Sequence, residues 1–343
     1  MKFKIRIAAV TVCAAAMLFS GCKNGDSASA EAETTFDSAG YESRIQELES
    51  QVESLKAETV PDISFKNKND FLLGKDNPAV SEAAALKEEA MADLPETITI
   101  KGTEYSTSLT TLTLNNMELE DEDIKDLKYM VNLTELHIYQ NNITDITPIK
   151  GLTGLKTLSL FKNNISDLSP LAGLVSLEDL YLRSNNITDI KPLEGLYSLV
   201  TLDLGENKIT DIKPLAELRN LELLRLNDNA VTDISALSGL KNMDRLHLQN
   251  NSVSDIAPVS NMVDLTEIYL ENNSVSDVEP LMSLTSLGWI KLGGNPVSNL
   301  TPLTNLPALK KLYIENTGVS EEEVQSLQDA LPDTTIVTKA SNY

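Results

Sequence analysis

The sequence predicts an α/β solenoid, in which short parallel strands form a β-sheet on a concave side and short 3-10 or irregular segments form the convex side. Three observations lead to this fold. Leucine or methionine recurs every 22 residues at nine successive positions from 133 to 309. Apolar residues alternate after each of them, as in a half-buried strand. An asparagine, an aspartate and a proline then recur at fixed places, and such units bury a core only when they stack.

A representative unit begins at Leu177 and reads LEDLYLRSNNITDIKPLEGL. The first unit, from Leu109, has 24 residues and carries Met117 where most units have asparagine, and the last unit carries Thr317 there. Atypical end units are expected of a capped array. The pattern resembles the leucine-rich repeat family, and its 22-residue length with an Asp-Ile-x-Pro-Leu second half resembles the internalin-type class. The resemblance implies a horseshoe of ten units over residues 109–318 and a role in recognition.

The three recurring polar positions have structural explanations. The asparagine amides are expected to satisfy backbone groups that the turn after each strand leaves unpaired. Proline presets φ for a short helical turn, and the aspartate is expected to cap that turn. Because these acids repeat along the array, we interpret them as scaffold rather than as catalytic or metal-binding residues. The asparagines are Asn141, Asn163, Asn185, Asn207, Asn229, Asn251, Asn273 and Asn295, and the aspartates are Asp145, Asp167, Asp189, Asp211, Asp233, Asp255 and Asp277.

Both ends of the array need a cap to cover the open apolar core. Residues 59–108 are predicted to form a linker and an N-terminal helix and strand cap. Ser81 is the expected N-cap of a helix over residues 82–93. Alternation over Thr97–Ile100 predicts a strand. Residues 319–343 are expected to form the C-terminal cap.

Residues 1–21 are predicted to be a lipoprotein signal peptide. Three cations precede an apolar run of 13 residues, Ile7–Phe19, which is too short to span a bilayer. The sequence Leu18-Phe19-Ser20-Gly21-Cys22 resembles a bacterial lipobox, with Phe19 as a departure from the more usual leucine. A chance cysteine after an ordinary signal peptide is the alternative. We expect lipidation of Cys22 to anchor the chain to a bacterial membrane, on the outer side and through acyl chains alone.

Two segments separate the anchor from the cap. Residues 22–40 are rich in Ser, Ala, Gly and acids and are expected to form a flexible tether. Residues 41–58 show heptad spacing, with Ile45 and Val52 at a and two leucines at d. This pattern predicts a short coiled-coil-like helix that forms a parallel homodimer through residues 41–57. A lone helix in a stalk is the alternative, because two heptads are few.

Composition excludes several classes of function. The net charge is −23, which leaves no basic surface for a nucleic acid and argues against docking on anionic lipid. Both cysteines, Cys13 and Cys22, lie near the N-terminus, and the two histidines, His137 and His247, lie five units apart. At about 4.8 Å per strand, they are too far apart to share a metal or form a catalytic dyad. We therefore expect no enzymatic activity, no metal and no cofactor.

The remaining candidates for a ligand site are side chains on the exposed face of the strands. Counted from the first leucine of a unit, positions 3, 5, 7 and 8 are expected to face solvent on the concave side. Six of the eight aromatic residues between 109 and 316 lie at these positions, as do both histidines. Exposed aromatics mark interfaces, although aromatic residues also suit strands in general. The candidate ligand-binding residues are His137, Tyr139, Phe161, Tyr181, Arg183, Arg225, Arg245, His247, Tyr269, Trp289 and Tyr313.

The sequence thus favours a surface-tethered, non-enzymatic recognition protein that binds a protein partner through its concave face, in adhesion or in an envelope interaction. A glycan-binding or structural envelope lipoprotein is the alternative, because aromatic rings can stack on sugars and acids can bind their hydroxyl groups. The identity of the partner does not follow from the fold.

Overall fold

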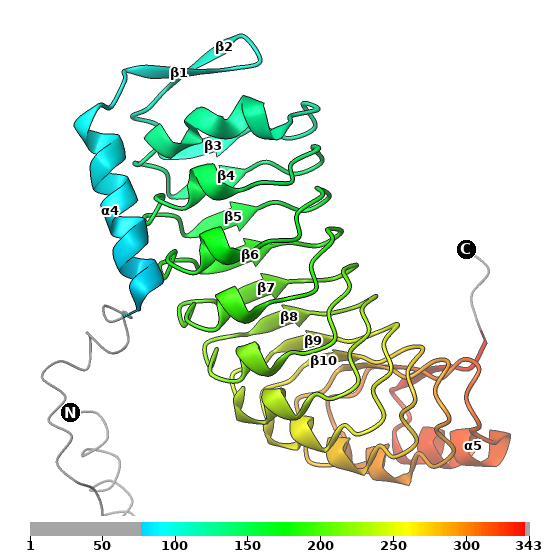
Figure 1. Cartoon of the computed structure of the whole chain (residues 1–343). Coiled ribbons are helices and arrows are strands. Elements are labelled where there is room, and N and C mark those ends of the chain that lie inside the picture. Colours follow the sequence, from blue (N-terminus) through cyan, green and yellow to red (C-terminus); the bar gives the residue numbers. More distant parts are fainter. Residues whose placement is uncertain (1–76, 340–343) are drawn as a thin grey trace, which may run out of the picture. The chain divides into compact units, whose positions relative to one another are not determined.

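The computed structural model describes residues 77–339, which form a curved solenoid (Figure 1). Its main feature is a sheet of eleven strands, all paired in parallel and in sequence order from β3 to β13. Each of the ten units contributes one three-residue strand, and the predicted solenoid is confirmed. The strands are β3 (Thr111–Thr113), β4 (Glu135–His137), β5 (Thr157–Ser159), β6 (Asp179–Tyr181), β7 (Thr201–Asp203), β8 (Leu223–Arg225), β9 (Arg245–His247), β10 (Glu267–Tyr269), β11 (Trp289–Lys291) and β12 (Lys311–Tyr313).

Short 3-10 helices form the side opposite the sheet. In seven units a proline stands near the start of the helix, as in η4 (Lys191–Leu193). The recurring aspartate caps the helix in six of these units, and Asn299 takes its place before η9. Asp189 Oδ1, for example, accepts a hydrogen bond from the backbone N–H of Lys191 at 2.8 Å. The other 3-10 helices are η1 (Asp121–Tyr129), η2 (Thr147–Ile149), η3 (Ser169–Leu171), η5 (Lys213–Leu215), η6 (Ser235–Gly239), η7 (Ala257–Asn261), η8 (Glu279–Leu281) and η9 (Thr301–Asn305).

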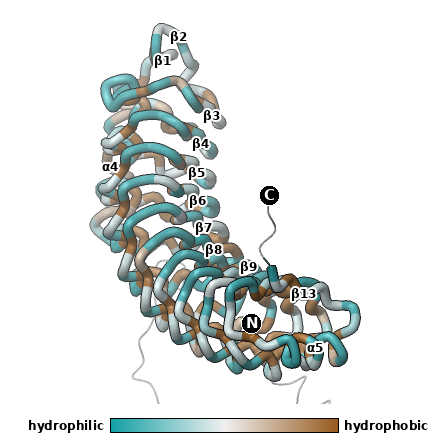
Figure 2. The backbone as a smooth tube through the Cα atoms, turned by 90° about the vertical axis from the view of Figure 1, so that its right-hand side faces the viewer, coloured by the Kyte–Doolittle hydropathy of each residue, from teal (hydrophilic) through white to brown (hydrophobic). Residues whose placement is uncertain are grey.

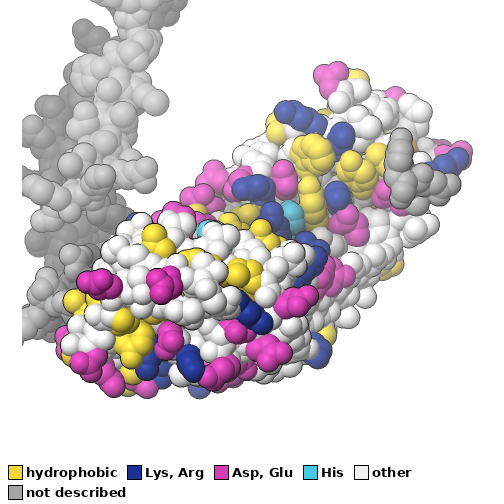
Figure 3. Space-filling view, turned by 90° about the horizontal axis from the view of Figure 1, so that it is seen from above, with side chains coloured by type: hydrophobic (Ala, Val, Ile, Leu, Met, Phe, Trp, Pro, Cys, Tyr) yellow, Lys and Arg dark blue, Asp and Glu magenta, His cyan; other side chains and the backbone are white. Residues whose placement is uncertain are grey.

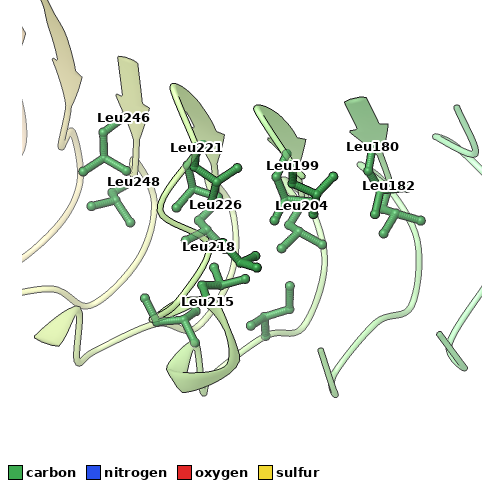
Figure 4. Close-up of a cluster of buried hydrophobic side chains, with 14 of the residues drawn as sticks. Leu180, Leu182, Leu199, Leu204, Leu215, Leu218, Leu221, Leu226, Leu246 and Leu248 are labelled. Carbon is green, nitrogen blue, oxygen red and sulfur yellow. The ribbon is translucent and has the colours of Figure 1, made fainter. Parts of the chain in front are cut away.

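The core lies between the sheet and these helices and runs through every unit. Leu199 and Leu204 enter it from the strand side, and Leu215 and Leu218 enter from the 3-10 side (Figure 4). All four side chains are fully buried. The hydropathy tube shows the same alternation of apolar inner and polar outer residues along the whole array (Figure 2). Each unit is therefore stabilised by its neighbours rather than by its own contacts.

The asparagine ladder joins successive units, as predicted. Asn185 Nδ2 donates to the carbonyl oxygens of Leu160 and Leu182, each at 3.0 Å, and its Oδ1 accepts from the N–H of Ile165 at 3.0 Å. The residue before each asparagine, at position 8, has a positive φ, such as 56° at Ser184. The strands end at position 5, so position 8 belongs to a left-handed turn and not to the strand face.

The helix of the N-terminal cap begins earlier than predicted. Helix α4 (Pro78–Ala92) starts four residues before residue 82, and Ser81 lies inside it rather than at its N-cap. Asn77 is the N-cap, because its Oδ1 accepts from the N–H of Ala79 at 3.0 Å and Pro78 presets the helical φ. After the helix, β1 (Thr97–Ile100), the predicted strand, pairs antiparallel with β2 (Thr103–Ser106).

Helix α4 packs along the flank of units 2 to 4, on a line of glycines (Figure 1). A Cβ added to Gly173 would lie 2.6 Å from the Cβ of Ala83 and closer still to the carbonyl oxygen of Ala79. Gly151 meets Leu86 in the same way, and Gly195 meets the side chain of Asn77. The helix can therefore lie this close to the array because glycine, which has no side chain, stands at this position of units 2 to 4.

The C-terminal cap consists of α5 (Glu321–Ala330) and β13 (Thr335–Val337). Ser320 caps the helix through a hydrogen bond from the N–H of Glu323 at 3.1 Å. Strand β13 extends the sheet beyond the last unit. Within residues 77–339, no helix is long and apolar enough to cross a membrane. The predicted signal peptide, Cys22, the tether and the segment 41–58 lie outside the described residues.

Candidate functional site

The concave face is formed by the side chains at positions 3, 5 and 7 of the units. Parallel pairing brings the same position of successive units side by side, so each position forms a row across the sheet. All eleven candidate residues lie on this face, and Figure 3 shows hydrophobic, basic and acidic side chains interspersed on the surface seen from above. All except Arg183 are half-buried, because neighbouring side chains in a row cover one another.

At the N-terminal end of the face, two aromatic residues form a stacked pair. The rings of Tyr139 and Phe161 lie 4.4 Å apart between centroids and are inclined by 18°. His137 and Tyr181 stand in the row at position 5, with Ser159 between them. The structure thus brings Tyr139 and Phe161 together and leaves Tyr181 as a separate ring two strands from His137.

At the C-terminal end, four side chains at position 5 form one continuous stack, which we call the C-terminal row: His247, Tyr269, Lys291 and Tyr313. The rings of His247 and Tyr269 lie 4.3 Å apart at 18°. Lys291 Nζ lies 4.2 Å from the centroid of the Tyr269 ring and 5.4 Å from that of Tyr313. A cation over a ring face is attracted by the ring quadrupole, so Lys291 links the two tyrosines.

A second cation and ring pair lies beside this row. Lys311 Nζ is 4.8 Å from the centroid of the Trp289 ring, and the two residues are neighbours in register at position 3. Sequence reasoning did not include Lys291 or Lys311 among the site residues. The available signal was their register, since both occupy the same rows as the aromatic candidates.

This stacking decides which part of each ring a ligand can reach. Tyr269 has His247 on one neighbouring strand and Lys291 on the other, and both contact its ring face. Tyr139 and Phe161 likewise cover one face of each other. The rings of the C-terminal row therefore present edges and hydroxyl groups to solvent more than open faces.

The three arginine candidates each have a carboxylate close by. Arg183 Nε donates to Glu206 Oε1 at 3.0 Å. The Arg225 guanidinium lies 3.7 Å from Asp203, and that of Arg245 lies 3.3 Å from Asp244. These cations are already partly neutralised by the protein. They position charge on the face rather than leaving a free anion site.

Asp203 is the buried acid of the face. Burial raises the pKa of its carboxyl, and the N–H of Gly205, which donates at 3.1 Å, and Arg225 offset part of that rise. Glu271 shows the same effect of burial, which raises its pKa, although Lys291 lies 3.4 Å away. Neither acid is paired with a histidine or a hydroxyl nucleophile in a way that would serve acid–base chemistry.

His247 is held in its neutral form. Burial lowers its pKa to about 4, and the nearby cations Arg225, Lys291 and Arg245 contribute in the same direction. Its Nε2 lies 3.9 Å from Glu267. The ring therefore acts as an aromatic surface in the stack at neutral pH. His137 lies on β4 and His247 on β9, so the structure does not bring them together. Within residues 77–339, no three His, Cys, Asp or Glu side chains are grouped to hold a metal.

The solenoid with a continuous parallel sheet and one 3-10 turn per unit defines a leucine-rich repeat protein. The family model for leucine-rich repeats (two copies) matches residues 131–173, 175–217 and 219–261. The match and the solenoid together support a leucine-rich repeat family for this chain. A comparison with curated protein sequences gives no match.

Three solved structures show where the similarity lies. The internalin InlF of Listeria monocytogenes is 25% identical over 79% of this chain and 92% of its own, with a TM-score of 0.58. The internalin InlC2 of the same species is 32% identical over 68% of this chain and 90% of its own, with a TM-score of 0.46. The ectodomain of the Arabidopsis thaliana receptor kinase GASSHO1, in complex with CASPARIAN STRIP INTEGRITY FACTOR 2, is 21% identical over 63% of this chain and 30% of its own, with a TM-score of 0.52.

Proposed function

We propose that this chain is an exported, surface-tethered recognition protein that binds a protein partner through its concave face and catalyses no reaction. The observation that carries the proposal is the arrangement of aromatic side chains. Six rings lie on one face, at positions 3, 5 and 7 of the units, although the core of the same units is filled by aliphatic residues. Half-buried aromatic and arginine side chains are the groups that dominate binding energy in protein interfaces.

The size of the face supports a protein ligand. Eleven parallel strands span roughly 48 Å at about 4.8 Å per step, which is enough for an interface of standard size. The GASSHO1 ectodomain, which shares the fold, was solved in complex with CASPARIAN STRIP INTEGRITY FACTOR 2. The internalin InlF shares the fold over most of its own length.

Ring geometry favours a protein over a glycan. A sugar that stacks on an aromatic residue needs an open ring face. In the C-terminal row, His247 and Lys291 cover Tyr269 from its two neighbouring strands. Edges and hydroxyl groups suit the mixed apolar and polar contacts of a protein surface. The glycan-binding or structural envelope role remains the second candidate.

The surface location rests on the N-terminal sequence. A lipid anchor at Cys22 followed by the 22–40 tether would display the repeats outside the cytoplasmic membrane of a bacterium. We further propose that residues 41–57 form a parallel homodimer. Light scattering of the mature chain with and without residues 41–57 tests the dimer. A monomeric mass for both chains would contradict it.

The concave face is tested by cross-linking and affinity capture from cell-surface proteins. The bait is residues 23–343, which include α4. A chain without α4 would expose the surface of units 2 to 4 on which this helix packs. The variant Tyr139→Ala, Tyr181→Ala, Trp289→Ala is expected to lose the captured protein. The matched control is Val263→Ala, Met282→Ala, which removes two exposed apolar side chains outside the strands and should retain it.

The outcomes separate the candidates. Capture of the same proteins by both variants, or of nothing by the unmodified chain, contradicts the concave face as a protein-binding surface. Protease treatment of the target surface then tests the glycan alternative. Binding that survives proteolysis indicates a carbohydrate, and binding that disappears indicates a protein.

A further inference from the structure

The residues at position 2 of successive units form a row just before the strands, and one of them is a glycine. Position 2 of the units carries a side chain in every unit except the ninth, where Gly288 stands. Its neighbours in this row are Thr266 in the preceding unit and Lys310 in the following one. The backbone conformation does not require a glycine here, since the φ of Gly288 lies outside the left-handed region. The gap is therefore a local feature of surface shape rather than of folding.

A pocket of about 440 Å³ opens at this gap, which we call the Gly288 pocket. This volume lies in the range of small-ligand sites. The pocket borders the C-terminal end of the concave face, because Trp289 forms part of its wall. Pro307, Ala308 and Leu309 supply further apolar surface. Such a wall suits a side chain with an apolar stem.

The charged groups of the pocket are mainly acidic. Glu267 and Asp333 line it, against the single ammonium group of Lys310. Among the ion pairs of residues 77–339, Glu267 contacts only His247, which is neutral at pH 7, and Asp333 contacts no cation. The Tyr269 hydroxyl lies 3.3 Å from Glu267 but cannot neutralise it. Among the residues that line the pocket, two carboxylates thus face one ammonium group, beside an aromatic ring that Lys311 also contacts.

We propose that the Gly288 pocket binds an arginine side chain of the protein partner, as a basic anchor at the C-terminal end of the concave face. This inference rests on the proposed function of that face. The methylene stem of arginine packs against Trp289 and the apolar wall, and its planar guanidinium donates to the carboxylate of Asp333, while Glu267 adds negative charge on the other side of the pocket. Arginine is also the charged residue most often found at the centre of interface energetics.

The charge of the whole chain acts in the same direction. A net charge of −23 attracts a basic partner over long distance and raises its rate of encounter. The pocket then supplies the short-range contact that the general field cannot. A neutral side chain of the same shape would gain the apolar contact but not the attraction of the carboxylates.

The single tryptophan of the chain reports on this pocket directly. The experiment titrates residues 23–343 with N-acetyl-arginine methylamide and follows Trp289 fluorescence at physiological salt. N-acetyl-citrulline methylamide, which is neutral and nearly isosteric, is the matched probe. The expected result is a saturable change with the arginine probe at millimolar concentration and at least ten-fold weaker binding of the citrulline probe. An equal response to both probes, or no saturable response, overturns the proposal.

Gly288→Thr tests the pocket itself. Threonine occupies the same place in the preceding unit, and a Cβ at Gly288 would lie 3.6 Å from the nearest neighbouring atom, which is an ordinary contact. The variant should fold normally and lose at least ten-fold in affinity for the arginine probe. Gly239→Thr, where the nearest atom is 3.7 Å from an added Cβ, is the control and should bind as the unmodified chain does. Unchanged binding by Gly288→Thr contradicts the proposal.

Calorimetric titration of Asp333→Asn gives a readout that does not depend on fluorescence, and the proposal requires weaker binding of the arginine probe. Failure of this inference differs from failure of the proposed function. If the arginine probe does not bind but the concave-face variant still loses its captured protein, the pocket assignment falls and the proposed function stands. If the probe binds but the concave-face variant captures the same proteins, the proposed function falls.

Discussion

The two ends of the concave face use aromatic residues in different ways. At the N-terminal end, Tyr139 and Phe161 stack on each other through dispersion and quadrupole contacts. At the C-terminal end, cations lie over ring faces, and Lys291 contacts two tyrosines and an acid. The same repeat scaffold thus produces one apolar contact region and one region whose shape depends on charge. The second is expected to respond to pH and salt, and the first is not.

The largest expected effect is the pH dependence caused by His247. In the unfolded chain this histidine takes up a proton near pH 6.5, whereas in the folded protein its pKa is about 4. The folded state therefore binds fewer protons between these values, and stability falls as the pH drops from 6.5 to 4. The loss reaches at most about 3 kcal/mol at pH 4.

Urea unfolding from pH 7 to pH 4.5 measures this effect against His247→Gln. The difference in unfolding free energy between the two proteins should shift in favour of the variant as the pH falls. The comparison cancels the acids with raised pKa values, such as Asp203 and Glu271, which act with the opposite sign. Parallel curves for the two proteins over this range would contradict a neutral, buried His247.

The flanks of the two regions differ as well, and this leads to the second prediction. Helix α4 covers the flank of units 2 to 4, whereas Val263 and Met282 stand exposed on units 7 and 8. Gly173→Val drives a side chain into Ala79 and Ala83 and is expected to destabilise the N-terminal region by about 1–3 kcal/mol.

Hydrogen exchange locates the damage. Amide protection in α4 should fall in Gly173→Val while protection in β9 to β12 stays unchanged, because repeats contact only their neighbours. Gly239→Val places the same side chain at the same position of the repeat on the uncovered flank and should leave α4 unaffected. A uniform loss of protection along the whole array would contradict the expectation that α4 stabilises only the units it contacts.

Periodicity carried most of the fold. A 22-residue repeat with alternation after each leucine is a local signal that recurs ten times, so the sheet, the asparagine ladder and the aspartate caps follow from it. The start of α4 did not follow, because both Asn77 and Ser81 are good N-cap residues and only Asn77 precedes a proline. The surface on which α4 packs was also missed, since the role of the glycines at 151, 173 and 195 is clear only when the helix lies on them.

The site was predicted less completely than the fold. Positions 3, 5 and 7 follow from the period of a strand, so the aromatic candidates could be placed on one face. Which rings contact each other depends on side-chain directions across strands, and these are not local. Lys291 and Lys311 were therefore overlooked, and Gly288 gave no signal as a single glycine in a variable position.

The smallest expected effect sharpens the comparison at a single residue. Lys291→Met keeps the length of the side chain but removes the cation between Tyr269 and Tyr313 and the partner of Glu271. A half-buried cation–π contact is worth about 0.5–1 kcal/mol, so the free energy of unfolding should fall by about that amount. The effect should shrink at high salt, because part of it is the ion pair with Glu271. Lys310→Met, at an exposed neighbouring position, should change stability by less than about 0.5 kcal/mol. Equal effects of the two substitutions would mean that Lys291 does not hold the C-terminal row together, and that the two aromatic regions differ in composition but not in how they are stabilised.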